Sequence, residues 1–342
     1  MQENLGYFYR HPTSDIVLEI FRRNRFFNSL LLLPYTVLVR IWPVFDVDPP
    51  PMAHQGVLTD WLFGGIASNH ILSLVTGILL VFLQALMINR LVIRNRLTNE
   101  LTLFPGLFYI LLVSFFPVYN GLSAPLIANT FIIIGLEQLY ATQKKSRSAG
   151  RIFSSGFWLS MSMLFYFGNI VLLLCGLVGL SMLRTVKARE WLQYLIGYAA
   201  PIAIVGMLDY LLHTDASAVS AHFNEQFGAL QFDVEWSYWV YGQLFFFGTI
   251  LLLSIFNSAS FHLKKNIHVQ KKVSFLFWLL FFLLGAVLVQ RGLDVHAWMP
   301  VILPMSVFIA MLLIRSKQLL LLEILHFTLL LALIGLNILY LT

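Results

Sequence analysis

The second apolar segment of the chain, residues 70–89, reads HILSLVTGILLVFLQALMIN, and Arg90 follows it directly. This run has no Asp, Glu, Lys or Arg, and its length is close to the roughly 20 residues that an α-helix needs to cross a hydrocarbon core of about 30 Å. Apolar segments of similar length recur from residue 26 to the C-terminus. The pattern predicts an all-α fold built from membrane-spanning helices.

The composition supports the same fold class. Of 342 residues, 59% are hydrophobic and only 11% are charged, and the mean hydropathy is +0.80. A soluble domain with a solvated surface needs more charge than this. We therefore predict a polytopic integral membrane protein with about eleven spans, at residues 26–43, 70–89, 102–118, 123–140, 152–167, 169–183, 191–212, 237–257, 273–290, 298–314 and 319–341.

The positions of the basic residues predict how the chain is oriented in the membrane. If the N-terminus is cytoplasmic, all 22 Lys and Arg residues except Arg40 and Arg291 fall on the cytoplasmic side, as the positive-inside bias requires. Residues 1–25 are then a cytoplasmic segment, and residues 26–342 form one transmembrane domain with outer loops at 44–69 and 213–236. We expect a multi-pass protein of a bacterial inner membrane, with membrane lipids and not nucleic acid as its partners, since basic loops account for the net charge.

The stretch 152–183 is too long to form one span and rather short to form two. Both flanks are basic, so the stretch must cross an even number of times, and its Gly168-Asn169 turn should stop below the outer surface. Irregular backbone at membrane depth needs a lining of protein or water. The turn therefore predicts a cavity beside Asn169.

Two carboxylates follow the first span, in the sequence WPVFDVDP of residues 42–49. In an extended chain Asp46 and Asp48 project to the same side. They could bind a divalent cation or act as a general base. The other interpretation is a solvated loop, and the sequence does not decide between them.

Two further polar groups fall on the outer side. Arg291, Asp294 and His296 lie in a short turn between long apolar spans, where Arg291 either binds a phosphate or pairs with Asp294. Arg40, near the outer end of the first span, either binds a phosphate or extends to the lipid headgroups. Asn129, inside the fourth span, needs either a partner on another helix or a cavity.

Several stretches between residues 84 and 201 resemble a multi-pass membrane protein family of Bacteroidota: ALMINRL at 85–91, LFPGLFY at 103–109, LSAPLIAN at 122–129 and SGFWLSMSMLFY at 155–166. The layout is also similar to the GT-C superfamily of glycosyltransferases that use polyprenyl-phosphate-linked sugars. That resemblance implies an acidic motif in the first outer loop and a pair of short helices after the fourth span. Asp46 and Asp48 occupy the position of the motif, and residues 156–169 match the helix pair.

Two functions follow as expectations. In a GT-C-like transferase, Asp48 or Asp46 would activate the acceptor, Arg291 or Arg40 would stabilise the phosphate leaving group, and the cavity near Asn169 would admit the lipid chain. A divalent cation is the one cofactor that this chemistry suggests. The alternative is a non-catalytic subunit that scaffolds a cell-envelope or secretion complex, with other membrane proteins as partners.

Overall fold

A computed structural model describes residues 17–45, 57–67, 69–115, 119–143, 148–185, 187–213, 238–263, 265–289, 295–315 and 319–341. Every regular element in these ranges is a helix. The all-α class is therefore confirmed for the described part of the chain.

The α-helices, with the connecting 3₁₀ turns, have the following bounds: α1 Val17–Arg22, α2 Phe26–Leu30, α3 Leu32–Arg40, η1 Trp42–Phe45, α4 Val57–Ala67, α5 His70–Asn95, α6 Phe104–Val113, α7 Ala124–Tyr140, α8 Ala149–Phe165, η3 Phe167–Val171, α9 Leu172–Leu183, α10 Ala188–His213, α12 Tyr238–Phe256, α13 Ser258–His262, α14 Ile267–Val289, η4 Val295–Trp298, α15 Met299–Arg315 and α16 Leu319–Leu341.

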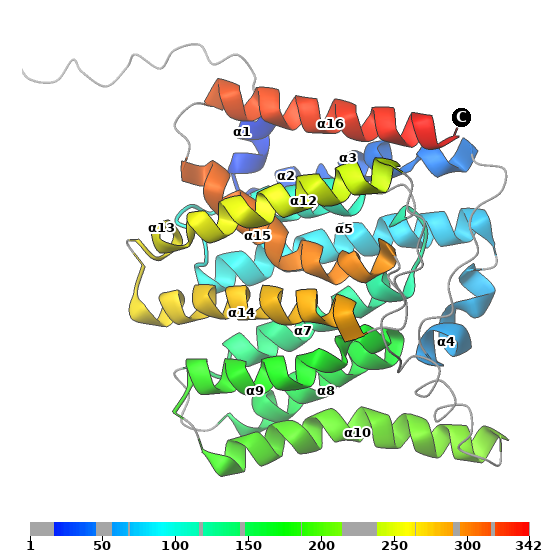
Figure 1. Cartoon of the computed structure of the whole chain (residues 1–342), viewed down its shortest axis with the longest axis vertical. Coiled ribbons are helices and arrows are strands. Elements are labelled where there is room, and N and C mark those ends of the chain that lie inside the picture. Colours follow the sequence, from blue (N-terminus) through cyan, green and yellow to red (C-terminus); the bar gives the residue numbers. More distant parts are fainter. Residues whose placement is uncertain are drawn as a thin grey trace, which may run out of the picture.

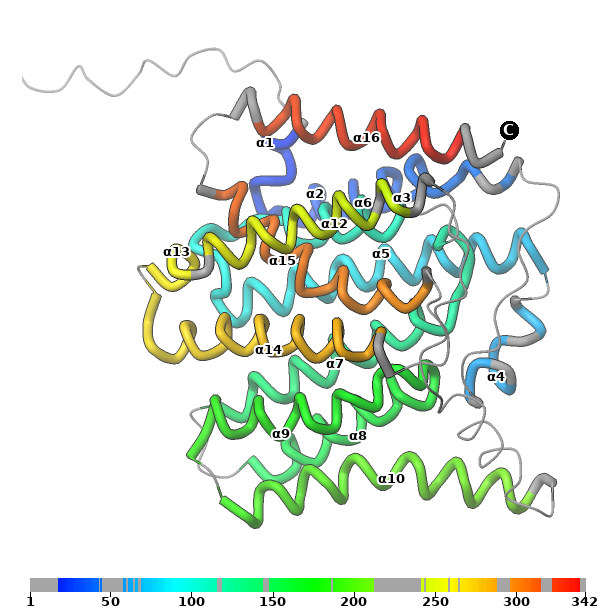
Figure 2. The backbone as a smooth tube through the Cα atoms, viewed as in Figure 1, coloured from blue at the N-terminus to red at the C-terminus, as the bar shows by residue number. Residues whose placement is uncertain are grey.

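Figure 1 shows the longer helices side by side, with successive helices running in opposite directions, and the backbone tube of Figure 2 shows the same arrangement. Each of the predicted spans overlaps a helix or helix pair in the structure, although predicted span 102–118 contains only the ten-residue α6. Four helices are long and apolar enough to cross a membrane: His70–Asn95, Ala188–Leu211, Ile267–Val287 and His296–Ile314. The protein is thus a helical membrane protein, while a count of about eleven spans stays a prediction.

The two ends of the bundle differ in charge. The end where α3, α6 and α8 finish contains Arg40, and we call it the Arg40 end. We call the opposite end of the bundle the basic end. The other described Lys and Arg residues lie there, in α1, in the segment before α2, or near the ends of the longer helices (Figure 1). The structure therefore places at one end of the bundle the basic residues that the positive-inside bias assigned to one side of the membrane.

Proline fixes the shape of the first predicted span. Pro34 lacks an N–H, and its ring crowds the carbonyl of Leu30, four residues earlier. The hydrogen-bond pattern is interrupted at Leu31, between α2, which ends at Leu30, and α3, which begins at Leu32. Leu31 keeps right-handed helical angles (φ −64°, ψ −17°), so α2 and α3 follow one another as one interrupted helix that ends at Arg40.

Close backbone contact joins α8 to α10. A Cβ atom on Gly156 would overlap the Tyr194 carbonyl, and one on Gly197 would overlap the Phe153 carbonyl. Small residues allow membrane helices to approach to this distance. The contact fixes the position of α10, the outermost helix at the lower edge of Figure 1.

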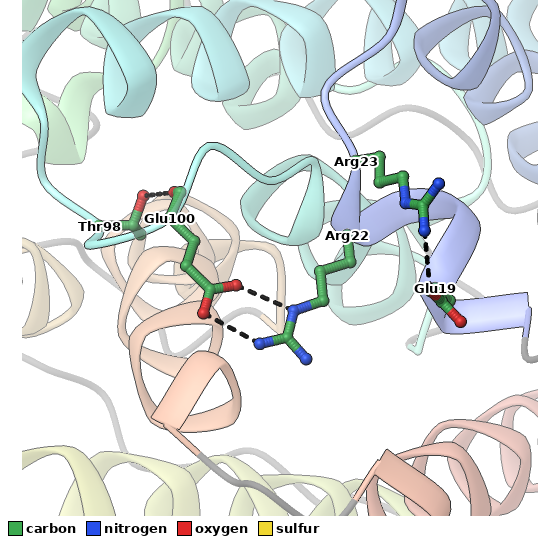
Figure 3. Close-up of polar contacts among 5 residues, drawn as sticks. All are labelled: Glu19, Arg22, Arg23, Thr98 and Glu100. Atoms are coloured by element: carbon green, nitrogen blue, oxygen red, sulfur yellow. Dashed lines mark hydrogen bonds and ion pairs between the residues drawn. The ribbon is translucent and has the colours of Figure 1, made fainter. Parts of the chain in front are cut away.

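At the basic end, a bidentate ion pair attaches α1 to the segment between α5 and α6. Figure 3 shows the Arg22 Nε and Nη2 atoms donating to the two Glu100 carboxylate oxygens, each at 2.9 Å. The Thr98 hydroxyl donates to the Glu100 carbonyl at 2.7 Å and orders this segment. The pair is partly exposed, so it orients α1 more than it stabilises the fold.

Candidate functional site: a buried arginine at the end of α3

Arg40 is the last residue of α3, and its side chain is fully enclosed by protein, with a relative exposure of 0%. One terminal nitrogen donates to the Tyr119 carbonyl, and the other makes a long contact of 3.5 Å with the Ser114 hydroxyl. The Nε–H has no hydrogen-bond partner. The side chain therefore points into the protein and does not extend to the headgroups, which was one of the two roles considered for it.

Two features of the local fold hold Arg40 in this position. The carbonyl end of a helix carries partial negative charge, so a cation is favoured at the C-terminus of α3. Ser114 ends α6 directly after Val113, and Tyr119 lies in the connection to α7. These acceptors are neutral, and each satisfies only one donor.

The charge of Arg40 lacks compensation within the described residues, because none of their carboxylates forms an ion pair with it. A buried guanidinium without an anion is costly, and such groups in membrane proteins face a partner or a functional cavity. A guanidinium has five N–H donors in a planar fork that suits phosphate or carboxylate. The arrangement can therefore bind an anion.

A second polar group is centred on Tyr109 of α6, the helix that ends at the Ser114 that contacts Arg40. The Tyr109 hydroxyl donates to the Gln84 side chain at 2.6 Å and accepts from Asn129 Nδ2 at 3.2 Å. Asn129 Nδ2 also lies 3.4 Å from the Met299 carbonyl. These bonds join α5, α6, α7 and α15, and they confirm that Asn129 has partners on other helices.

His296 is brought close to the Arg40 group. Its ring, in η4, lies 5.5 Å from the ring of Tyr119, whose carbonyl accepts from Arg40. The next residue, Asn120, donates to Asn337 of α16 at 2.7 Å. The connection between α6 and α7 thus links two of the predicted site residues, Arg40 and His296.

Asn169 belongs to a different part of the molecule. It lies in η3 and donates to the Ser162 hydroxyl at 2.7 Å, and its side chain is fully buried. Gly168 beside it faces the Tyr166 ring and the Ala286 carbonyl of α14. The turn is therefore lined by protein, as irregular backbone at membrane depth requires, and the cavity predicted here stays a prediction.

The remaining predicted site residues, Asp46, Asp48, Arg291 and Asp294, lie outside the described residues. Asp46 directly follows η1, and Asp294 directly precedes η4. Among the residues that the structure describes, no three His, Cys, Asp or Glu residues are grouped as a metal site would need.

Sequence reasoning missed several polar side chains that form hydrogen bonds between helices. Gln84, Tyr109 and Asn337 were not singled out, although Gln84 and Asn337 are amides within apolar segments. Such residues usually bond across helices. Their presence was a usable signal, but only the fold shows which partner each one takes.

The comparisons do not assign this helical membrane protein to a family. No family model matches the chain, and no curated protein or solved structure shows a significant match.

Proposed function

We propose that the protein binds the phosphate of a polyprenyl-phosphate-linked sugar and transfers the sugar at the outer face of a bacterial inner membrane, as a GT-C-like glycosyltransferase. The observation that supports this proposal is Arg40, a fully buried guanidinium with an unpaired Nε–H and no carboxylate partner among the described residues. A phosphate would supply the missing negative charge.

In this mechanism Arg40 binds the phosphate and stabilises the negative charge that develops on it as the glycosidic bond breaks. Asp48 or Asp46 accepts the proton from the acceptor hydroxyl as that oxygen attacks the sugar. Only four residues of η1 and Ile41 separate Arg40 from Asp46, so the Cα atoms of the two residues are at most about 22 Å apart. Arg291, five residues before His296, is a second phosphate ligand in this proposal.

A transfer assay in membranes tests the catalytic part. Asp46→Asn combined with Asp48→Asn removes the base, and we expect transfer from polyprenyl-phosphate mannose or glucose to fall to background. The matched control, Asp233→Asn with Glu235→Gln, makes the same charge change in the other outer loop and should leave transfer intact. Membrane abundance, measured by immunoblot, should be equal in both.

A binding assay tests the phosphate site separately. Arg40→Met should abolish binding of geranylgeranyl phosphate to protein in nanodiscs, whereas the Asp46/Asp48 double variant should still bind it. Full transfer activity in the double variant would refute the assignment of the base, and unchanged binding by Arg40→Met would refute the phosphate site.

A non-catalytic scaffold in a cell-envelope or secretion complex is the second proposal. It is favoured by the absence, within the described residues, of a carboxylate beside Arg40 that could serve as a base. Stable co-purification of other membrane proteins, together with full complementation by the Asp46/Asp48 and Arg40 variants, would support it over the transferase.

A further inference from the structure

Two exposed arginines of α5 lie at the depth of lipid headgroups. The helix begins at His70, and Arg90 follows 20 residues later, so at 1.5 Å per residue it lies about 30 Å along the helix axis. This distance is close to the thickness of a hydrocarbon core. Arg90 and Arg94, one helical turn apart on the same face, therefore lie where the phosphates of the leaflet at the basic end are expected.

Both arginines face one carboxylate oxygen of α7. Arg94 Nη1 donates to Glu137 Oε1 at 2.5 Å, and Arg90 Nε lies 3.8 Å from the same oxygen, which is too far for a hydrogen bond. We call Arg90, Arg94 and Glu137 the Arg90 cluster. Its two positive charges and one negative charge leave a surplus of one positive charge.

Other ion pairs at the basic end have no such surplus. Each joins one cation to one carboxylate through two hydrogen bonds of 2.8 to 2.9 Å, as in Arg22–Glu100 and Arg184–Glu190. In these pairs both carboxylate oxygens accept from the same guanidinium. The Arg90 cluster differs, because its two guanidiniums share a single oxygen.

The arginines of the cluster are accessible without movement of any helix. The side chain of Arg90 is 71% exposed and that of Arg94 is 52% exposed, whereas that of Glu137 is only 22% exposed. A guanidinium presents a planar fork of N–H donors that suits a phosphate. An anion can therefore approach the arginines from the side opposite Glu137.

An exposed apolar stripe runs along α5 to the cluster. Spacings of three and four residues place its members on the helix face that also contains Arg90 and Arg94. The stripe consists of four side chains that are 44 to 51% exposed: Leu72, Val75, Leu79 and Leu83. A surface of this kind suits hydrocarbon.

Helix α7, which contacts α5, has the same arrangement beside the stripe. Phe131 and Ile134 are partly exposed and precede Glu137 at intervals of three residues, so the three side chains share one face. On both helices an apolar surface thus ends at the charged groups of the Arg90 cluster.

This combination favours a lipid over other anions. An acidic peptide or a free phosphate would pair with the arginines but leave the apolar stripe without a role. A phospholipid has its phosphate at the end of its acyl chains, and both parts then meet a complementary surface. A lipid of net negative charge also matches the surplus charge, whereas a zwitterionic lipid brings a cation of its own.

We propose that the Arg90 cluster and the apolar stripe of α5 form a binding site for an anionic phospholipid of the leaflet at the basic end. The phosphate pairs with Arg90 and Arg94, and the acyl chains lie along the stripe. The site is independent of the proposed function, because Arg40 lies at the opposite end of the bundle. Arg40→Met should therefore bind the phospholipid as the wild-type protein does.

Native mass spectrometry of the full chain in detergent tests the site, with dioleoyl-phosphatidylglycerol as the probe. Each basic residue near an anionic headgroup contributes about a factor of five, so Arg90→Gln with Arg94→Gln should weaken binding of the first lipid about 30-fold. Both side chains are exposed, and thermal stability should change little. Unchanged affinity in this double variant would overturn the proposal.

A matched variant controls for general charge. Lys187 and Arg189 are also exposed and lie at the basic end, at the start of α10. Lys187→Gln with Arg189→Gln removes the same charge and should leave the affinity for phosphatidylglycerol within about twofold of wild type. Equal losses in the two double variants would show that the lipid responds only to net charge, and the site would be refuted.

Other probes separate the lipid from other anions. Dioleoyl-phosphatidylethanolamine should bind several-fold more weakly than phosphatidylglycerol, and glycerol 3-phosphate, which lacks acyl chains, should not compete with it. Competition by glycerol 3-phosphate at equal concentration would refute the role of the stripe. Displacement of the lipid by a deca-glutamate peptide at equal concentration would instead identify a surface for an acidic protein.

Glu137 gives a test in the opposite direction. Glu137→Gln removes the carboxylate that partly neutralises both arginines, so the surplus rises from one charge to two. We expect this variant to bind phosphatidylglycerol about fivefold more tightly than the wild-type protein. Weaker binding in a variant of unchanged thermal stability would contradict the surplus charge as the basis of recognition.

Discussion

At the scale of single residues, Arg40 shows a conflict between stability and function. A buried charge without a counter-charge destabilises the protein that contains it, and replacement by an apolar side chain of similar volume is often neutral or stabilising. A ligand that supplies the missing charge would offset this cost. Tyr109 does not share this conflict, because its hydroxyl both donates and accepts within the protein.

We therefore predict that Arg40→Met raises the thermal stability of the ligand-free protein, by about 1–4 kcal/mol. The same variant should show no further rise when geranylgeranyl phosphate is added, whereas the wild-type protein should be stabilised by it. Thermal unfolding followed by intrinsic fluorescence in detergent measures both effects. A large loss of stability in Arg40→Met would show that the guanidinium is already compensated.

At the scale of elements, the existence and order of the helices could be predicted from the apolar segments, because each segment must hide its backbone polar groups in a helix. Helix ends were less accurate. The prediction for 70–89 stopped at Arg90, but α5 continues to Asn95 and ends where Arg96 takes a left-handed φ of 53°. The first charged residue marks the predicted membrane boundary, but the backbone hydrogen bonds of the helix continue beyond it.

Contacts between elements could not be predicted in this way. Gly197 and Gly206 both lie in α10 and look alike in the sequence, but a Cβ atom on Gly197 would overlap the Phe153 carbonyl, and one on Gly206 would have no atom within 4 Å. Which glycine faces α8 depends on the rotation of the helix, and apolar residues surround both.

The two glycines form a matched pair for mutation. Gly197→Ala should separate α8 from α10 and lower stability by about 1–3 kcal/mol, while Gly206→Ala should be neutral or slightly stabilising. Thermal unfolding in detergent is a sufficient measurement. Equal effects of the two substitutions would mean that the α8–α10 contact is looser than described.

At the scale of the whole molecule, the segregation of charge is the main guide to orientation. The described Lys and Arg residues other than Arg40 gather near one end of the bundle, which the positive-inside bias assigns to the cytoplasm. The candidate site could be predicted only in part. Arg40 and His296 were identified from their predicted outer position, whereas their connection through Tyr119 depends on contacts between segments far apart in the sequence.

Labelling of single cysteines tests the orientation. In a Cys175→Ala background, Ser217→Cys in the predicted outer loop should react with a membrane-impermeant maleimide in intact spheroplasts. Ser146→Cys in the predicted cytoplasmic connection should react only after permeabilisation. The reverse pattern would invert the topology and place Arg40 on the cytoplasmic side.

Helix α6 has a consequence for how the protein is made. All ten residues of α6 are buried, and its main neighbours are α5, which precedes it directly, and α15, which begins at Met299. At about 1.5 Å per residue α6 measures only about 15 Å, half a hydrocarbon core. The ribosome must synthesise roughly 190 more residues before α15 can enclose this helix. During that interval the nascent chain needs α5, or an insertase, to keep the Tyr109 hydroxyl of α6 away from lipid.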